Sequence, residues 1–162
     1  MSRNKLTVKQ GRIILLLFLF VLIIYIGWSL TPDAVVLVIR DVRTNEKLLT
    51  EYVSIGDALN FGWIHSLESF PWQEHFYITP NHTLMLHTIS FPSFGAGVPE
   101  DRGAAVRIED GLIIMYEIND EFDEIVWLNS HDFVQNITIN GEVVTSGEDL
   151  PERELRMTIE KR

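Results

Sequence analysis

The succession of short β-forming runs from Ala34 onward constrains the fold of this chain more than any other feature. Runs rich in valine, isoleucine and aromatic residues alternate with clusters of glycine, proline, asparagine and aspartate. None of them shows the 3.6-residue period of an amphipathic helix. The pattern predicts about ten strands, at Val35–Arg40, Leu48–Val53, Leu59–His65, Trp72–Ile78, Leu84–Phe91, Ala105–Ile108, Leu112–Tyr116, Ile125–Leu128, Val134–Ile139 and Glu142–Thr145. Many short strands separated by turn residues are typical of an all-β antiparallel sandwich or small barrel.

Two dipeptides mark tight hairpin turns within this pattern. Asp110-Gly111 and Asn140-Gly141 each lie between apolar runs, where a two-residue turn requires positive φ. We expect the β domain to cover residues 34–146 and residues 147–162 to form a charged tail. The chain contains no cysteine, which excludes disulfides, thiolate metal sites and cysteine nucleophiles. The domain must therefore be stabilised by packing alone.

An uncharged apolar segment precedes the β domain. Residues 13–30 would span about 27 Å as a helix, close to the thickness of a bilayer's hydrocarbon core. The four basic residues of segment 1–12 all precede it, which places that segment in the cytoplasm and the β domain outside, with residues 31–33 as a spacer. The competing interpretation is a cleaved signal peptide, because Gly27 and Ser29 are small residues two positions apart, a pattern that signal peptidase can accept at a cleavage site. Under either interpretation the β domain is exported from the cytoplasm.

The charge of the chain is divided unevenly. Residues 1–32 carry four basic and no acidic side chains, whereas residues 33–162 carry nine basic and 23 acidic ones, a difference of −14. So acidic a domain repels phosphate backbones, which argues against nucleic-acid binding. High acidity is more often a matter of solubility, although it would also attract a basic partner or a cation.

The densest group of chemically capable side chains lies in the ten residues His65-Ser66-Leu67-Glu68-Ser69-Phe70-Pro71-Trp72-Gln73-Glu74. If His65 lies opposite Trp72 in a hairpin, Trp63 pairs with Glu74 and the apolar faces of both strands coincide. His65 and Glu74 would then be diagonal neighbours on the inner face. Three interpretations follow: a buried hydrogen-bonded pair that fixes the hairpin, a ligand pocket, or a catalytic group. No known catalytic motif supports the third, and Ser66 lacks a nucleophile elbow.

Other polar segments give weaker signals. The Gly95-Ala96-Gly97 run could turn sharply or receive an anion, but it is no P-loop. The segment 117–124 carries five carboxylates without the spacing of a calcium loop, so we expect a solvated acidic loop. The histidines show no zinc-ligand spacing. The sequence thus predicts neither a metal nor a cofactor.

Several of these pieces together resemble the bacterial domain-of-unknown-function family numbered 1850. The resemblance is carried by His65-Ser66-x-Glu68, then Trp72-x-Glu74, then Ser93-Phe94-Gly95-Ala96-Gly97, and extends to a late histidine before the turn at Asn140-Gly141. It covers roughly residues 34–146. The candidate binding residues that follow from it and from the hairpin are His65, Ser66, Glu68, Trp72, Glu74, Ser93, Gly95, Gly97 and His131.

The resemblance implies a role beside a transporter. Members of that family are often encoded next to TAXI-type tripartite (TRAP) transporters, which use an extracytoplasmic solute-binding protein. The expectation is therefore a single-pass, non-enzymatic accessory protein of the cell membrane whose outer domain contacts a transporter subunit or its binding protein. The alternative is an exported small-ligand-binding protein or enzyme that uses His65, Glu68 and Glu74.

Overall fold

A computed structural model describes residues 12, 15–22, 34–95 and 105–162 of the chain. The chain divides into two units, residues 1–33 and 34–162. In the first unit residues 12 and 15–22 are helical. No helix among the described residues is long and apolar enough to cross a membrane. Most of the expected anchor, the spacer 31–33 and Gly97 lie outside the described residues.

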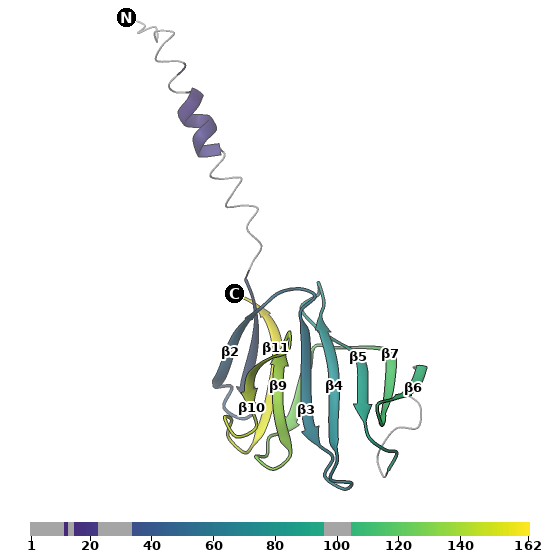
Figure 1. Cartoon of the computed structure of the whole chain (residues 1–162). Helices are drawn as coiled ribbons and strands as arrows, with labels where there is room; N and C mark the ends of the chain where they lie inside the picture. The colour runs from purple at the N-terminus through teal and green to yellow at the C-terminus, as the bar shows by residue number, and fades with distance from the viewer. Residues whose placement is uncertain (1–11, 13–14, 23–33, 96–104) are drawn as a thin grey trace, which may run out of the picture. The chain divides into compact units, whose positions relative to one another are not determined.

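The second unit is all-β, as the sequence predicts, and its described strands form two antiparallel sheets (Figure 1). The bounds are β1 Val35–Asp41, β2 Lys47–Val53, β3 Ala58–Ile64, β4 Pro71–Ile78, β5 Leu84–Phe91, β6 Ala105–Glu109, β7 Leu112–Phe122, β8 Glu124–Leu128, β9 Val134–Ile139, β10 Glu142–Ser146 and β11 Glu154–Lys161. Each of the ten predicted strands is present. The described strands do not close into a barrel, so the sandwich alternative is the correct one.

The smaller sheet has the order β2-β1-β11-β8 and corrects the predicted end of the domain. Residues 147–162 are not a tail, because β11 lies between β1 and β8 in this sheet. Its inner positions Leu155, Met157 and Ile159 are buried, while charged and polar residues alternate with them. That alternation is the period of a strand with one face in the core. The sequence of β11 contains four charged residues, Glu154, Arg156, Glu160 and Lys161, which is why a solvated tail was expected.

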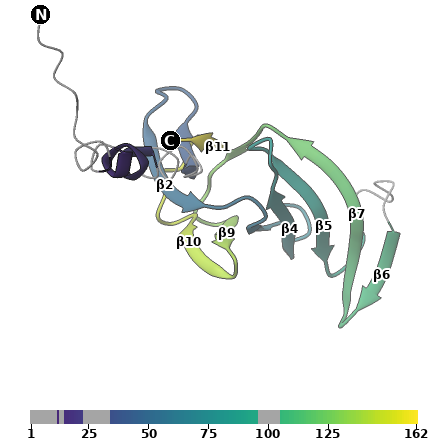
Figure 2. The same cartoon turned by 90° about the horizontal axis from the view of Figure 1, so that it is seen from above.

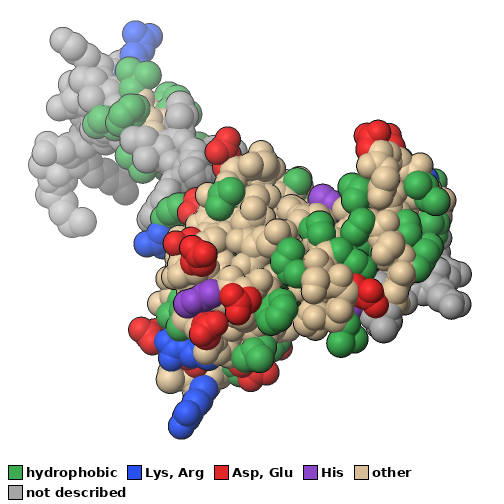
Figure 3. Space-filling model, turned by 60° about the horizontal axis from the view of Figure 1, so that its bottom comes forward, with side chains coloured by type: hydrophobic (Ala, Val, Ile, Leu, Met, Phe, Trp, Pro, Cys, Tyr) green, Lys and Arg blue, Asp and Glu red, His purple; other side chains and the backbone are tan. Residues whose placement is uncertain are grey.

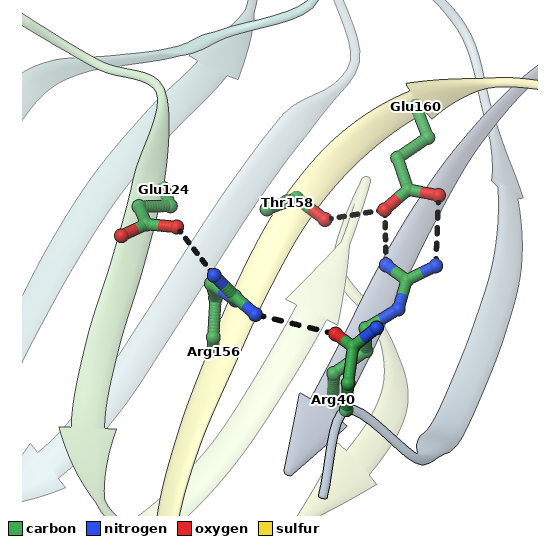
Figure 4. A network of polar contacts seen from close by, with 6 residues as sticks. Arg40, Glu124, Arg156, Thr158 and Glu160 are labelled. Carbon is green, nitrogen blue, oxygen red and sulfur yellow. Dashed lines mark hydrogen bonds and ion pairs between the residues drawn. The ribbon is translucent and has the colours of Figure 1, made fainter. Parts of the chain in front are cut away.

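The outer face of the smaller sheet carries a network of ion pairs (Figure 4). Arg40 on β1 forms a two-pronged ion pair with Glu160 on β11, which also accepts a hydrogen bond of 2.9 Å from the hydroxyl of Thr158. Arg156 contacts Glu124 on β8 at 3.4 Å. These contacts connect β1, β11 and β8 across the face turned away from the core.

The larger sheet has the order β10-β9-β3-β4-β5-β7-β6 and curves strongly. Register shifts occur between β4 and β5, β5 and β7, β3 and β9, and β9 and β10, and such irregularities increase local twist. Figure 2 shows β4, β5, β7 and β6 curving away from the smaller sheet. The core lies between the sheets, with Leu37, Ile39 and Met157 on one side and Leu59, Ile89 and Ile137 on the other.

The segment 117–124 is not the solvated loop that its acidity suggests. It continues β7 to Phe122 and begins β8 at Glu124, so one stretch of chain passes from the larger sheet to the smaller. Glu117 and Asn119 have positive φ, at the irregularity that separates the two pairings of β7 with β5. The Glu121 carboxylate accepts hydrogen bonds from Thr83 and Thr79, which lowers its pKa.

Candidate functional site

The hairpin formed by β3 and β4 positions the residues singled out in the sequence. Its observed register pairs Trp63 with Trp72, Phe61 with Glu74 and Leu59 with Phe76. The predicted register is therefore wrong by two residues, although the predicted faces are right, because an even shift leaves each side chain on its own face. His65 lies four positions along the chain from Phe61, the residue opposite Glu74. The expected diagonal pairing of His65 with Glu74 is thus replaced by other contacts.

His65 begins a closed loop that joins the two strands. Its backbone N–H donates to the Phe70 carbonyl at 2.8 Å, and the Ser69 N–H donates back to the His65 carbonyl at 2.7 Å. The imidazole is only 8% exposed. It stacks against the rings of Trp63 and Phe70, and the Trp72 ring lies 5.9 Å away. His65 is therefore a buried packing residue that holds the loop in place.

The loop meets the segment that follows β5 at the same end of the larger sheet (Figure 1). A Cβ added to Gly95 would lie 2.6 Å from Cδ of Glu68, so the Glu68 side chain lies directly on the glycine. The Phe91 ring stacks on Trp72 at 4.7 Å, which joins the strands behind this contact. The structure thus brings together the two motif pieces that the sequence placed 25 residues apart, Ser66–Glu68 and Ser93–Gly95.

The surface of this contact combines apolar and polar groups. Leu67 is 73% exposed and Phe94 is 53% exposed, and Ser66, Glu68 and Ser93 are also exposed. Figure 3 turns this end of the domain forward and shows hydrophobic side chains exposed beside acidic ones. We call the surface made by Ser66–Ser69 and Ser93–Gly95 the motif end.

Glu74 lies further along β4, away from the motif end. The Trp72 indole N–H donates to its Oε1 at 3.2 Å. In the sheet, Glu74 lies between Phe61 on β3 and Ile89 on β5, so a half-buried carboxylate interrupts an apolar row of the inner face. A carboxylate in such a place must be stabilised by polar or cationic contacts.

Two hollows flank Glu74, and together they form a groove between the larger sheet and β8. One has a volume of about 320 Å³ and the other about 280 Å³, and both are lined by Glu74, Ile125 and Val126. We call this the β8 groove; its further lining residues are Phe61, Trp63, Trp127, Leu128, Phe133 and Val134 on one side of Glu74, and Phe76, Leu86, Phe122 and Glu124 on the other. Consecutive β8 residues line it, which shows that it follows the edge of that strand.

His131 belongs to neither the motif end nor the lining of the β8 groove. It lies between β8 and β9, where its Nε2 is 3.1 Å from the Leu150 carbonyl. The neighbouring Asn129, which the sequence analysis missed, is fully buried and donates to the carbonyls of Gly147 and Leu150 at 2.9 and 3.1 Å. Both residues thus hold in place the segment that precedes β11. A lone asparagine after an apolar run gave no sequence signal for this role.

The described residues contain no group of three or more histidine, aspartate or glutamate side chains that could hold a metal ion. The pKa of Glu121 is lowered chiefly by the Thr83 hydroxyl, and that of Asp149 by the Ser146 hydroxyl, so these carboxylates stabilise turns. The two candidate surfaces present different groups: an exposed apolar–acidic contact at the motif end, and an aromatic groove with a carboxylate beside β8.

Comparison with known proteins identifies the region that contains both surfaces. A family model described as a domain of unknown function, DUF1850, matches residues 59–145, a little over half of the chain. No curated protein and no solved structure matches the chain. The matched region runs from β3 to β10 and includes the motif end and the β8 groove, whereas β1, β2 and β11 lie outside it. The chain belongs to the DUF1850 family of domains of unknown function.

Proposed function

We propose that this chain is a membrane-anchored interaction module whose motif end binds a subunit of a tripartite solute transporter outside the cytoplasm. The observation that carries the proposal is the convergence of Glu68 and Gly95, with Leu67 and Phe94 exposed beside them. Protein interfaces commonly combine exposed apolar anchors with polar groups at their rim. The motif end has that composition, and it acts by recognition rather than catalysis.

The rigidity of the motif end supports this role. Backbone hydrogen bonds close the loop at His65, and aromatic stacking continues from His65 through Trp72 to Phe91 behind it. A loop whose backbone is closed before binding loses less conformational freedom when the partner arrives, so the affinity per contact is greater.

The transporter and the membrane enter the proposal from the sequence. The uncharged segment 13–30 follows four basic residues, which favours an anchor with the domain outside. The chain resembles a family whose members are often encoded beside TAXI-type TRAP transporters, which supports a transporter membrane subunit, or its solute-binding protein, as the partner. With a spacer of three residues, 31–33, an anchored domain would lie close to such a membrane subunit.

The proposal is tested by purifying the tagged full chain from native membranes and quantifying the transporter subunits that accompany it. Leu67→Glu and Phe94→Glu each place a charge on the motif end and should reduce recovery of the transporter subunit at least tenfold. Val143→Glu places the same charge on an exposed position of β10 and is the matched control. Recovery of no transporter subunit with the unaltered chain, or equal recovery with all variants, would refute the proposal.

A further inference from the structure

We propose that a hollow on the outer face of the smaller sheet binds the phosphate group of an anionic phospholipid. This contact depends on the membrane anchor of the proposed function, and it gives the β domain a second attachment to the bilayer. The hollow has a volume of about 320 Å³. We call it the basic hollow; its described lining residues are Val36, Lys47, Thr50, Tyr52, Glu160, Lys161 and Arg162.

The basic residues of the β domain are concentrated at this hollow. Residues 33–162 carry nine basic and 23 acidic side chains, yet three of the nine, Lys47, Lys161 and Arg162, line the basic hollow. The acidic residue among its described lining residues, Glu160, is held in the two-pronged ion pair with Arg40. Even without Lys161, the cations Arg40, Lys47 and Arg162 outnumber Glu160. The hollow is therefore a positive surface on an acidic domain, and it attracts anions.

Arg162 is positioned to receive a phosphate group. Its guanidinium lies 5.4 Å from the centre of the Tyr52 ring and donates a hydrogen bond to the Tyr52 hydroxyl. Because tyrosine is neutral here, the contact orients the guanidinium and leaves its charge in place. A guanidinium has five N–H donors and binds phosphate in a two-pronged manner. Tyr52 is 61% exposed, and tyrosine is enriched where proteins meet the membrane surface.

The length of the spacer determines which anion lies nearest. Ala34 follows the spacer 31–33, and three extended residues span at most about 11 Å. The headgroup layer of each leaflet is about 5–8 Å thick. An anchor that ends at residue 30 would therefore hold Ala34 within reach of the headgroups. The backbone N–H of Arg162 donates to the Ala34 carbonyl at 2.8 Å, so the basic hollow would be held there too. Lipid phosphate is thus the anion that the anchor keeps beside the hollow.

The motif end lies at the opposite end of the domain from Ala34. Strand β2 ends at Val53, which pairs with Val35, and a short loop leads from there to the start of β3 at Ala58. The seven residues of β3 then separate that end from the motif end by about 20 Å. Figure 1 shows the C-terminal end of the chain and the β3–β4 loop at opposite ends of the domain. Lipid binding at the basic hollow would therefore leave the motif end free for its partner.

The first test measures how closely the β domain approaches the headgroups. The chain has no cysteine, so Ser54→Cys, just beyond β2 at the Ala34 end, carries a single fluorophore. The full chain is reconstituted in nanodiscs of phosphatidylcholine, a fixed share of it with a nitroxide on the headgroup. Replacing part of the unlabelled lipid with phosphatidylglycerol should increase quenching at least twofold, and sodium chloride should reverse the increase, because salt screens the attraction. Equal quenching with and without phosphatidylglycerol would overturn the proposal.

A fluorophore at the motif end provides the geometric control. Ser66→Cys carries the same label on an exposed residue of the motif end. This label should be quenched less than the label at position 54 in both kinds of nanodisc, because it lies at the far end of β3. Equally strong quenching at both positions would contradict the orientation that lipid binding at the basic hollow requires.

The second test assigns the contact to the basic hollow. Lys47→Gln combined with Arg162→Gln should abolish the increase in quenching that phosphatidylglycerol causes. Arg43→Gln combined with Arg107→Gln removes two charges from exposed positions outside the hollow and should retain it. A thermal melt checks that each double variant is folded. An undiminished increase in the folded Lys47 and Arg162 double variant would place the lipid contact elsewhere and contradict the assignment.

Two further readouts separate the lipid from a free ion and the lipid contact from the anchor. Inorganic phosphate should reduce quenching no more than sodium chloride of equal ionic strength; a larger effect would show that the hollow holds the free ion and would overturn the choice of a lipid. A chain that separates from the nanodiscs on size exclusion would refute the anchor and the lipid contact together. A chain that stays with them but shows no phosphatidylglycerol effect would refute the lipid contact alone.

Discussion

At the scale of single residues, two glycines show how the effect of replacing glycine with alanine depends on the nearest neighbouring atom. A Cβ at Gly95 would meet the end of the flexible Glu68 side chain, whereas a Cβ at Gly147 would lie 2.4 Å from the Val134 backbone carbonyl. Glu68 can move and the backbone cannot. We expect Gly95→Ala to change the free energy of unfolding by less than about 0.5 kcal/mol, as surface substitutions usually do, and Gly147→Ala to lower it by about 1–3 kcal/mol through overpacking. Urea denaturation of both variants measures this, and equal effects would contradict the geometry.

The ion pair between Arg40 and Glu160 predicts a dependence of stability on pH. Hydrogen bonds from Arg40 lower the pKa of Glu160 below its usual value of 4.5. The unfolded chain therefore binds this proton more readily, so the contribution is fully present above about pH 4.5 and is lost as pH falls through the lower folded pKa. Glu160→Gln should reduce stability at pH 7 by no more than about 1 kcal/mol, because the pair is near the surface, and the deficit should shrink towards pH 3. Denaturation at both pH values, with Glu142→Gln as control, checks the sign.

At the scale of elements, β11 contributes to stability as a core strand, although the sequence predicts a tail there. Met157 on this strand is 0% exposed. Met157→Ala should lower the free energy of unfolding by about 2–5 kcal/mol, because it removes a fully buried side chain from the core. Glu154→Ala at the exposed start of the strand should change it by less than about 0.5 kcal/mol. If residues 147–162 were a dispensable tail, the two substitutions would have equally small effects on denaturation.

Strand β11 is also the strand that could not be predicted from the sequence alone. Strands β1 to β10 could be predicted because valine-rich and aromatic runs end at turn residues, and each turn signal is local. In β11 the charged residues of the outer face pair with β1 and β8, which a single sequence cannot reveal. The hairpin faces were predictable from alternation, but the register was not, since a shift of two residues in the pairing keeps the same side chains on each face. The contact of Glu68 with Gly95 was not predicted, because it joins two loops that are distant in the sequence, and the β8 groove depends on a strand from the other sheet.

At the scale of the whole β domain, the two candidate surfaces use different parts of one curved sheet. The motif end is made by loops beyond β3 and β5, and the groove lies where the larger sheet meets the edge of the smaller one. The Trp72 ring lies between them, because it contacts His65 on one side and donates to Glu74 on the other. A change at one surface can therefore reach the other only by moving the Trp72 ring.

This arrangement predicts that the motif end can be altered separately from the groove. Phe94→Glu should abolish recovery of the transporter subunit, because it places a charge on an exposed position of the motif end. Glu74→Gln should leave recovery of the transporter subunit unchanged, because Glu74 lies in the groove and away from the exposed loops. Both variants are compared by purification of the tagged full chain from membranes, and a thermal melt checks that each variant is folded. Loss of recovery in folded Glu74→Gln would show instead that the Trp72 ring couples the two surfaces, since a change on one side of it would then act on the other.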